Sequence, residues 1–199
     1  MTGKTHVKVS TCFALIAVMS MNFTRINYYV YMIVILMCSS AGAKFPDLDH
    51  SWCNIPDKNV VKWVVNKLIR YTGGRHRSRH THSIDVMIVT YICSNKLVEW
   101  YFGLGYLSQL DREILLMIII GFWSGWLSHL YADALTYDGI YWSCLFKYKL
   151  KLVPKKLFGI KFKTGEQWES FVYRSHIYIN GILGVWVVLY PIVQQVGII

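Results

Sequence analysis

The chain has 199 residues, of which 54% are hydrophobic and 16% charged, and its mean hydropathy is +0.34. A soluble domain carries about 25% charged residues, so this composition excludes a disordered chain and argues against an ordinary soluble domain. Surface that faces lipid explains the shortage of charge. The net charge of +10 leaves three readings open: a nucleic-acid partner, an anionic membrane surface, or the Lys/Arg bias of cytoplasmic loops.

Four or five stretches are apolar enough to enter a bilayer, whose core of about 30 Å needs about 20 helical residues. Their approximate bounds are 9–23, 26–43, 83–107, 114–135 and 177–199. The second and the fifth are the strongest, since each is long and contains no formally charged side chain. The first is the weakest, because Ser and Thr interrupt it and it is barely long enough to cross alone, so it is either a span or one arm of a tight helical hairpin. The sequence therefore predicts an all-α polytopic membrane protein, in which residues 1–199 form a single integral membrane domain with about five membrane-embedded helices.

The positive charges indicate which segments face the cytoplasm. With five crossings, residues 1–8, 44–83 and 136–176 lie on one side, and they hold 18 of the 21 Lys and Arg residues. The positive-inside rule places these segments, and the N-terminus with them, in the cytoplasm. This distribution accounts for the net charge without nucleic acid, and no nucleic-acid-binding module is recognisable. Signal-peptide cleavage after Ala43 is disfavoured, because two apolar stretches precede that site.

Two patterns in the cytoplasmic segments predict smaller elements. Residues 59–71 place valines and a leucine on one helical face and basic or amide side chains on the other, which predicts an interfacial helix on anionic lipid headgroups. From Phe146 to Leu152 apolar residues alternate with lysines, and the alternation resumes at residues 160–163 after a turn at Pro154. This pattern predicts a small basic β-ribbon that packs at the membrane surface or, as the alternative, contacts substrate.

Histidine and aspartate residues recur at the predicted cytoplasmic ends of the spans. His129 and Asp133 are four residues apart, so they share one face in the last turns of an apolar helix. His6, the segment Pro46–His50 and His82 reach the same membrane face if all five spans cross. Imidazole and carboxylate donors suit Zn²⁺ first, with Mn²⁺ or Fe²⁺ as alternatives, whereas the five scattered cysteines include no CxxC pair. A structural hydrogen-bond network without metal is the alternative explanation.

Five short motifs carry a resemblance to a known family. They are MTGKTH at residues 1–6, PDLDH at 46–50, HR…THS ending at Ser83, GWLSHLYADALT at 125–136 and TGEQWE at 164–169. In this order they resemble the YdjM-like family of bacterial membrane-bound proteins, described as inner-membrane proteins with a hydrolase-type metal site. The resemblance implies a multi-pass protein of the bacterial inner membrane whose metal-site residues are His6, Asp47, Asp49, His50, His82, His129 and Asp133, with Glu169 as a further candidate.

The family pattern HRGxTHS is altered in this chain. The segment from Arg75 to Ser83 is one residue longer between the first His and the Thr, and it lacks the Gly. The first His of the pattern therefore corresponds either to His76 or to His80, and this choice stays open.

A divalent ion with an open coordination position would activate water for hydrolysis. The position of the site predicts a phosphoester or ester substrate in a membrane lipid, with Asp49 or Glu169 as general base. Arg75, Arg77 and Arg79 are candidates for holding a phosphate, or they serve only as topology signals. No GxSxG or GxxxxGKS motif occurs. The alternatives are a non-catalytic membrane protein whose structural metal site recruits lipid or a protein partner and, with less support, a transporter.

Overall fold

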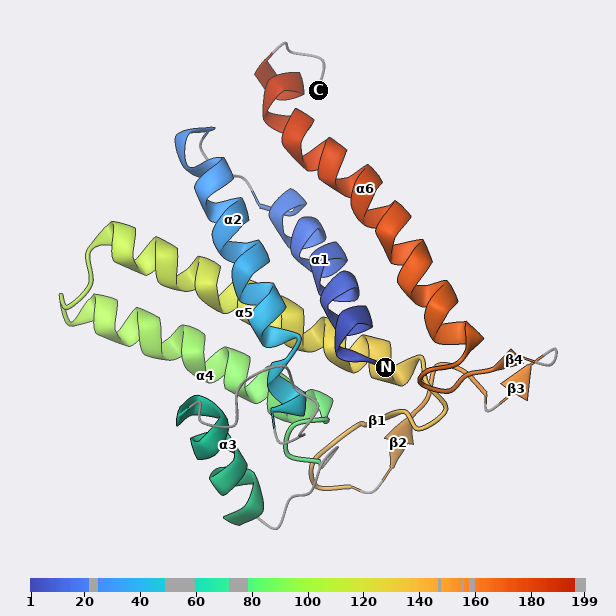
Figure 1. The fold of residues 1–199 in the computed structure, drawn as a ribbon. Coiled ribbons are helices and arrows are strands. Elements are labelled where there is room, and N and C mark those ends of the chain that lie inside the picture. Colours follow the sequence, from blue (N-terminus) through green and yellow to red (C-terminus); the bar gives the residue numbers. More distant parts are fainter. Residues whose placement is uncertain are drawn as a thin grey trace.

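The computed structural model consists mainly of α-helices (Figure 1). It describes residues 1–21, 25–48, 60–71, 79–146, 148–154, 156–157 and 160–195. The helices are α1 (Gly3–Met19), α2 (Arg25–Gly42), the 3-10 turn η1 (Phe45–Asp47), α3 (Val60–Tyr71), α4 (Ile84–Gly103), α5 (Gln109–Ala134) and α6 (Gln167–Gln195). All five apolar stretches predicted from the sequence fall on helices, and α3 coincides with the predicted amphipathic helix.

The start of α5 shows how a capping motif sets a boundary. Ser108 and Asp111 form a capping box, in which each side chain accepts a hydrogen bond from the backbone N–H of the other residue. This arrangement satisfies two N–H groups that lack partners in the first helical turn. The helix therefore begins at Gln109, ahead of the apolar run that starts at Ile114.

α5 is the central helix of the described structure. It packs against α1, α2 and α4, and α1 packs in turn against α2 and α6. Figure 1 shows α4 and α5 as a hairpin that runs obliquely to α1 and α2. Gly121 and Gly125 of α5 let the backbone of α2 approach closely: a Cβ built on Gly125 would lie 2.0 Å from the carbonyl oxygen of Ser39. Small residues at a helix crossing are typical of membrane proteins, in which close packing replaces the hydrophobic effect between helices.

Three helical segments are long and apolar enough to cross a membrane: Asn27–Asp47, Gln109–Ala134 and Gln167–Val193. They correspond to three of the five predicted spans. Only 11% of the last segment is buried inside the protein, as expected for a helix that lipid surrounds. The remaining two predicted spans correspond to α1, which has 17 residues, and to α4, which contains three charged residues. The five-span topology therefore stays a prediction.

The predicted basic ribbon is wrong in its pairing. β2 (Lys149–Leu150) pairs with β1 (Ile140–Tyr141), while β3 (Lys156–Leu157) forms a separate antiparallel pair with β4 (Ile160–Lys161). Gly139, at φ +66°, turns the chain so that Ile140 enters the core beside Met87, Trp126 and Leu130. Burial of this side chain selects the partner of β2, whereas alternation alone only shows that the segment is extended.

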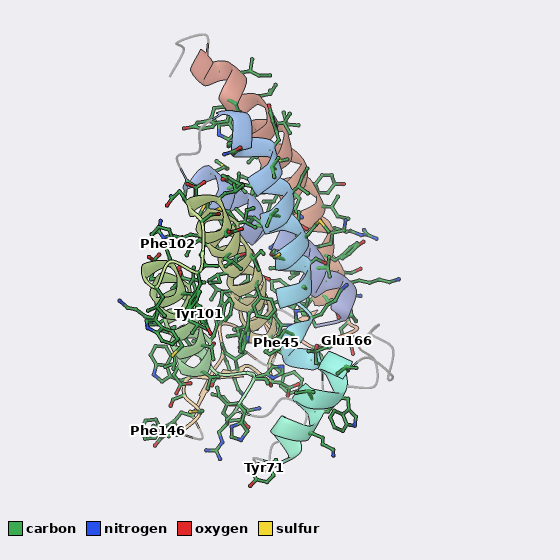
Figure 2. The ribbon with its side chains drawn as sticks, turned by 90° about the vertical axis from the view of Figure 1, so that its left-hand side faces the viewer. Phe45, Tyr71, Tyr101, Phe102, Phe146 and Glu166 are labelled. Carbon is green, nitrogen blue, oxygen red and sulfur yellow. The ribbon has the colours of Figure 1, made fainter. Side chains whose placement is uncertain are left out.

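α3 exposes several apolar side chains on its surface. Val60, Trp63 and Val64 are exposed, and Lys67 places its ammonium 4.5 Å from the centre of the Trp63 ring. Tyr71 lies at the tip of the helix, away from the other helices (Figure 2). Exposed apolar residues beside a cationic side chain are what a helix lying on a membrane surface requires.

Candidate metal centre

His129 and Asp133 occupy the last turns of α5 and form the centre of a buried polar cluster. Both residues are almost fully buried, and His129 Nε2 lies 3.5 Å from Asp133 Oδ2. The spacing of four residues places both side chains on one face, as the sequence predicts. Leu130 and Ala134 on the same end of the helix pack with Met87 and Ile140 in an apolar cluster, which anchors this end of α5.

His82 comes from the segment just before α4. Its Nε2 lies 3.4 Å from His129 Nε2 and 3.7 Å from Asp133 Oδ2. The indole of Trp126 donates a hydrogen bond to the carbonyl of Thr81, and the carbonyl of His82 accepts one from Tyr141, so both neighbouring elements fix this segment. Burial lowers the pKa of His82, which keeps the imidazole neutral and therefore in the form that binds a metal.

Asp47 reaches the cluster from η1, the short turn that follows α2. Its Oδ1 lies 3.5 Å from His82 Nε2 and 3.8 Å from His129 Nε2. Its side chain is 24% exposed, whereas the side chains of His82, His129 and Asp133 are at most 3% exposed. Asp47 therefore marks the side on which the cluster meets solvent.

His6 enters from the first turn of α1 and stacks on the ring of His129, with centroids 3.8 Å apart and planes 13° from parallel. Its Nε2 lies 3.1 Å from the carbonyl oxygen of Met1 and 3.5 Å from Asp133 Oδ1, which also accepts a 2.7 Å hydrogen bond from the Met1 amine. The Met1 carbonyl only accepts, so Nε2 carries the proton. Nδ1 is then an unprotonated nitrogen, buried and without a hydrogen-bond partner among the described residues.

Hydrogen bonds on the far side of two rings orient the remaining imidazoles. Nδ1 of His129 donates to the carbonyl of Ala43 over 2.7 Å, which leaves the Nε2 lone pair directed at the cluster. Nδ1 of His82 lies 2.9 Å from the hydroxyl of Thr81, so its Nε2 also faces inward. The two Nε2 atoms therefore face each other 3.4 Å apart, an arrangement that a shared cation would stabilise.

The spacing of these donors fits a metal ion. Among the residues that the structure describes, two groups have one donor atom per residue within 4.8 Å of one another, and His129 belongs to both: His6, His129 and Asp133, and Asp47, His82 and His129. A tetrahedral zinc site with bonds of about 2.1 Å has ligands about 3.4 Å apart. Distances of 3.4 to 3.8 Å between His82, His129 and the two carboxylates are close to this value. His6 belongs to the first of these groups, so its imidazole is a further donor for a cation.

A comparison with models of protein families shows to which family the chain belongs. The model of the YdjM inner membrane protein family matches residues 1–197. The chain belongs to the YdjM family. Comparisons with curated proteins and with solved structures gave no significant match. The resemblance seen in the sequence motifs is therefore confirmed over nearly the whole chain, and the family description supports an inner-membrane protein.

The structure brings together five of the residues that the YdjM motifs single out: His6, Asp47, His82, His129 and Asp133. Asp49 and His50 lie outside the described residues, as does His76. His80 is exposed and belongs to neither donor group, although His82 two residues later is buried within one.

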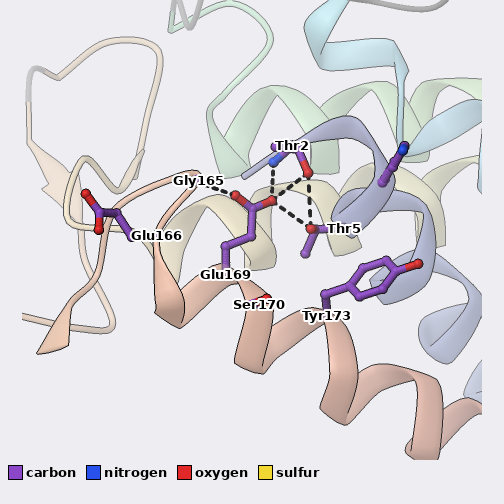
Figure 3. Close-up of a pocket in the computed structure, with 8 residues that line it drawn as sticks. Thr2, Thr5, Gly165, Glu166, Glu169, Ser170 and Tyr173 are labelled. Carbon is purple, nitrogen blue, oxygen red and sulfur yellow. Dashed lines mark hydrogen bonds between the residues drawn. The ribbon is translucent and has the colours of Figure 1, made fainter.

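Glu169, the further candidate, is buried but lies outside both donor groups. Its carboxylate accepts hydrogen bonds from Thr2, Thr5 and Gly165 (Figure 3). These contacts place Glu169 beside the N-terminal turn that carries His6.

Several supporting residues were not identified from the sequence. The Ala43 carbonyl and the Trp126 indole orient His129 and the His82 segment, and the hydroxyls of Thr2 and Thr5 bind Glu169. Three of these residues, Thr2, Thr5 and Trp126, lie inside the quoted motifs, which was the available signal for them. A backbone carbonyl leaves no mark in the sequence, so Ala43 had none.

Proposed function

We propose that this YdjM-family protein is a membrane-bound, metal-dependent hydrolase that cleaves a phosphoester or ester bond in a membrane lipid. The observation that carries the proposal is the buried group of three imidazoles and two carboxylates at the end of the apolar helix α5. Ionisable groups at such a position usually pair, bind an ion or serve a functional cavity. Pairing of each imidazole with a carboxylate does not explain why three histidines stack on or face one another.

The residues that would hold the ion are His6, Asp47, His82, His129 and Asp133. Zinc suits this donor set best, with manganese or iron as alternatives. When bound, the ion would activate a water molecule for attack on the ester or phosphoester bond. The chain's own contribution is to fix the donors, because the Ala43 carbonyl and the Thr81 hydroxyl orient two of the imidazoles before any ion arrives.

Asp49 is the carboxylate that we propose as general base, and His50 as a further ligand. Asp49 follows by two residues Asp47, the donor that lies on the solvent side of the cluster. Glu169 is a weaker candidate for the base, because its two oxygens already accept four hydrogen bonds. A carboxylate so engaged is stabilised in its charged form and is a poor proton acceptor.

The proposed substrate class follows from the position of the donor cluster relative to solvent and to the lipid headgroups. The partly exposed Asp47 marks the open side. α3 lies close by, since the Asn66 amide donates a hydrogen bond to the carbonyl of Leu48, and its exposed apolar side chains and Lys67 suit anionic headgroups. The distribution of Lys and Arg favours the cytoplasmic face for this end of the helices. A site at this level meets lipid esters before soluble metabolites.

One observation favours the alternative of a structural metal site. Four of the five donor residues are at most 2% exposed, which suits a closed site that clamps α1, η1, α5 and the segment before α4 together. Such a protein would recruit lipid or a protein partner without cleaving anything. Turnover separates the two functions, because the ligand types are the same in both.

The deciding experiment is metal analysis of the detergent-purified protein, followed by hydrolysis assays on vesicles of anionic phospholipid. We expect stoichiometric zinc in the parent, loss of zinc in His129→Ala and retention in His176→Ala, the matched control on α6 outside both donor groups. Lipid cleavage that disappears with the zinc supports the hydrolase. Bound zinc without cleavage favours the structural site, and a parent without metal contradicts both.

Topology is tested separately by labelling single cysteines introduced near His6 and near His50, in a chain whose five native cysteines are replaced. Both positions should react from the cytoplasmic side. Reaction from opposite compartments would contradict the five-span topology on which the position of the site depends.

A further inference from the structure

Glu169 makes an unusual set of contacts for a residue outside the metal cluster. Its Oε1 accepts three hydrogen bonds: from the backbone N–H of Thr2 at 2.5 Å, from the Thr2 hydroxyl at 2.6 Å and from the Thr5 hydroxyl at 2.7 Å. Its Oε2 accepts one from the backbone N–H of Gly165 at 2.7 Å. Figure 3 shows these bonds converging on the carboxylate from α1 and from the turn before α6. Hydrogen bonds to a buried carboxylate are among the stronger ones in proteins.

These contacts replace a missing helix cap. Thr2 is the N-cap residue of α1, yet its side chain makes no capping hydrogen bond within the helix. The hydroxyl instead donates to Glu169, whose negative charge lies at the positive end of the α1 dipole. The first turn of α1 is therefore held by a residue more than 160 positions away in the sequence.

His6 lies inside this turn. Its backbone N–H donates to the carbonyl of Thr2, so the residue that Glu169 holds by its N–H and hydroxyl also fixes the backbone of His6. Thr5, the immediate neighbour of His6, is 2% exposed and donates to the same carboxylate oxygen. The side chain of His6 then stacks on His129 in the cluster.

We infer that Glu169 is a positioning residue, which acts through Thr2 and Thr5 to hold His6 at the metal site. The inference rests on the proposed metal site and assigns Glu169 a role other than ligand or general base. It also gives α6 a function in the site, because the first turn of α6 carries the carboxylate. Without Glu169 the first turn of α1 loses its cap and these hydrogen bonds to α6, so the backbone that carries His6 is held less firmly.

The test is a double-mutant cycle on the full-length, detergent-purified protein, with zinc affinity measured by competition with a chelator. Glu169→Ala should weaken zinc binding about 10- to 100-fold, the range seen when a residue supporting a metal ligand is removed. In the His6→Ala background the same change should have less than about a threefold effect, since the ligand that Glu169 positions is already absent. Glu166→Ala is the matched control, because Glu166 lines the same cavity of about 390 Å³, whereas the carboxylate to which Thr2 and Thr5 donate is that of Glu169. An equal effect of Glu169→Ala with and without His6, or no effect in the parent, overturns the inference.

A metal-free measurement separates this inference from the proposed function. Hydrogen exchange in excess chelator should show faster exchange in Glu169→Ala at residues 2–8, with the segment 79–90 unchanged. A general loss of stability would raise exchange in both segments and contradict a positioning role. If the parent binds no zinc, the proposed metal site fails, and faster exchange confined to residues 2–8 still identifies the link between Glu169 and His6.

If Glu169→Ala does not fold, Thr5→Val provides a second variant, because valine has nearly the same shape as threonine. It removes one of the four hydrogen bonds and should weaken zinc binding in the same direction, again only when His6 is present. Unchanged zinc affinity in Thr5→Val would contradict the route through Thr5.

Discussion

A methyl group added to Gly125 should disturb the metal site although Gly125 carries no donor atom. The new Cβ would lie 2.0 Å from the carbonyl oxygen of Ser39, whereas ordinary contact begins near 3.4 Å, so α2 and α5 would have to separate locally by about 1.4 Å. The Ala43 carbonyl belongs to the adjoining turn of α2 and accepts the hydrogen bond from His129 over 2.7 Å. A displacement of that size along this bond lengthens it to about 4 Å, beyond hydrogen-bonding range.

Two effects of Gly125→Ala can be given magnitudes. Overpacking of this kind destabilises by about 1–3 kcal/mol, against a gain of up to about 1 kcal/mol from replacing Gly by Ala in a helix. Loss of the carbonyl that orients His129 should weaken metal binding about 10- to 100-fold. We therefore expect a lower unfolding temperature and a weaker zinc affinity in the same variant.

Gly181→Ala on α6 is the matched control, because a Cβ at that position meets no atom within 4 Å. It has the same gain in helix propensity without the clash, so it should keep the zinc affinity of the parent. The assays are chelator competition and thermal unfolding in detergent. Equal zinc affinity and equal stability in the two variants would refute the close approach of α2 and α5 as the support of the site.

Three further changes test other parts of the structure. Trp126→Phe removes the hydrogen bond to the Thr81 carbonyl, so it should lower stability by about 1 kcal/mol and weaken zinc binding. Thermal unfolding and chelator competition measure the two effects. Unchanged stability and zinc affinity would contradict the supporting role of the indole. Tyr31→Phe removes a hydrogen bond to Glu113 in the first turns of α5, far along the helix from the site, so stability should fall by a similar amount while zinc affinity stays the same. Burial lowers the pKa of His82, whose neighbours are Asp47, His129 and Asp133, so the unfolded chain binds a proton there that the folded one does not. In metal-free protein this group therefore contributes a loss of stability as pH falls below about 6.5, and unfolding measurements should show that His82→Gln loses less stability than the parent between pH 7.5 and 5.5; an equal loss would contradict the burial of a neutral His82.

The helices of this protein are largely readable from its sequence. Long apolar stretches and the amphipathic pattern of residues 59–71 predicted the helices because hydrophobic periodicity is a local property. Capping residues shifted the boundaries, as Ser108 and Asp111 did for α5. The spacing of His129 and Asp133 also predicted correctly that the two side chains share a face, because four residues make about one helical turn.

The pairing of the β-strands could not be predicted from local sequence patterns. Alternation of lysines and apolar residues predicted an extended segment at Lys149 and Leu150, but not its partner. The partner was decided by the burial of Ile140 against α4 and α5, a contact between elements that no local pattern records.

The sequence by itself determined which donors are available: three of the imidazoles and two of the carboxylates that its motifs single out are those that the structure gathers. Only the tertiary structure decided how they are held. The Gly125 crossing brings the Ala43 carbonyl to His129, and Glu169 reaches across from α6 to the turn that carries His6. The type and spacing of the donor residues can be read from the sequence. The contacts of His129 with Ala43 and of Thr5 with Glu169 join residues more than 80 and more than 160 positions apart, so they depend on how the helices pack, which is a property of the whole molecule.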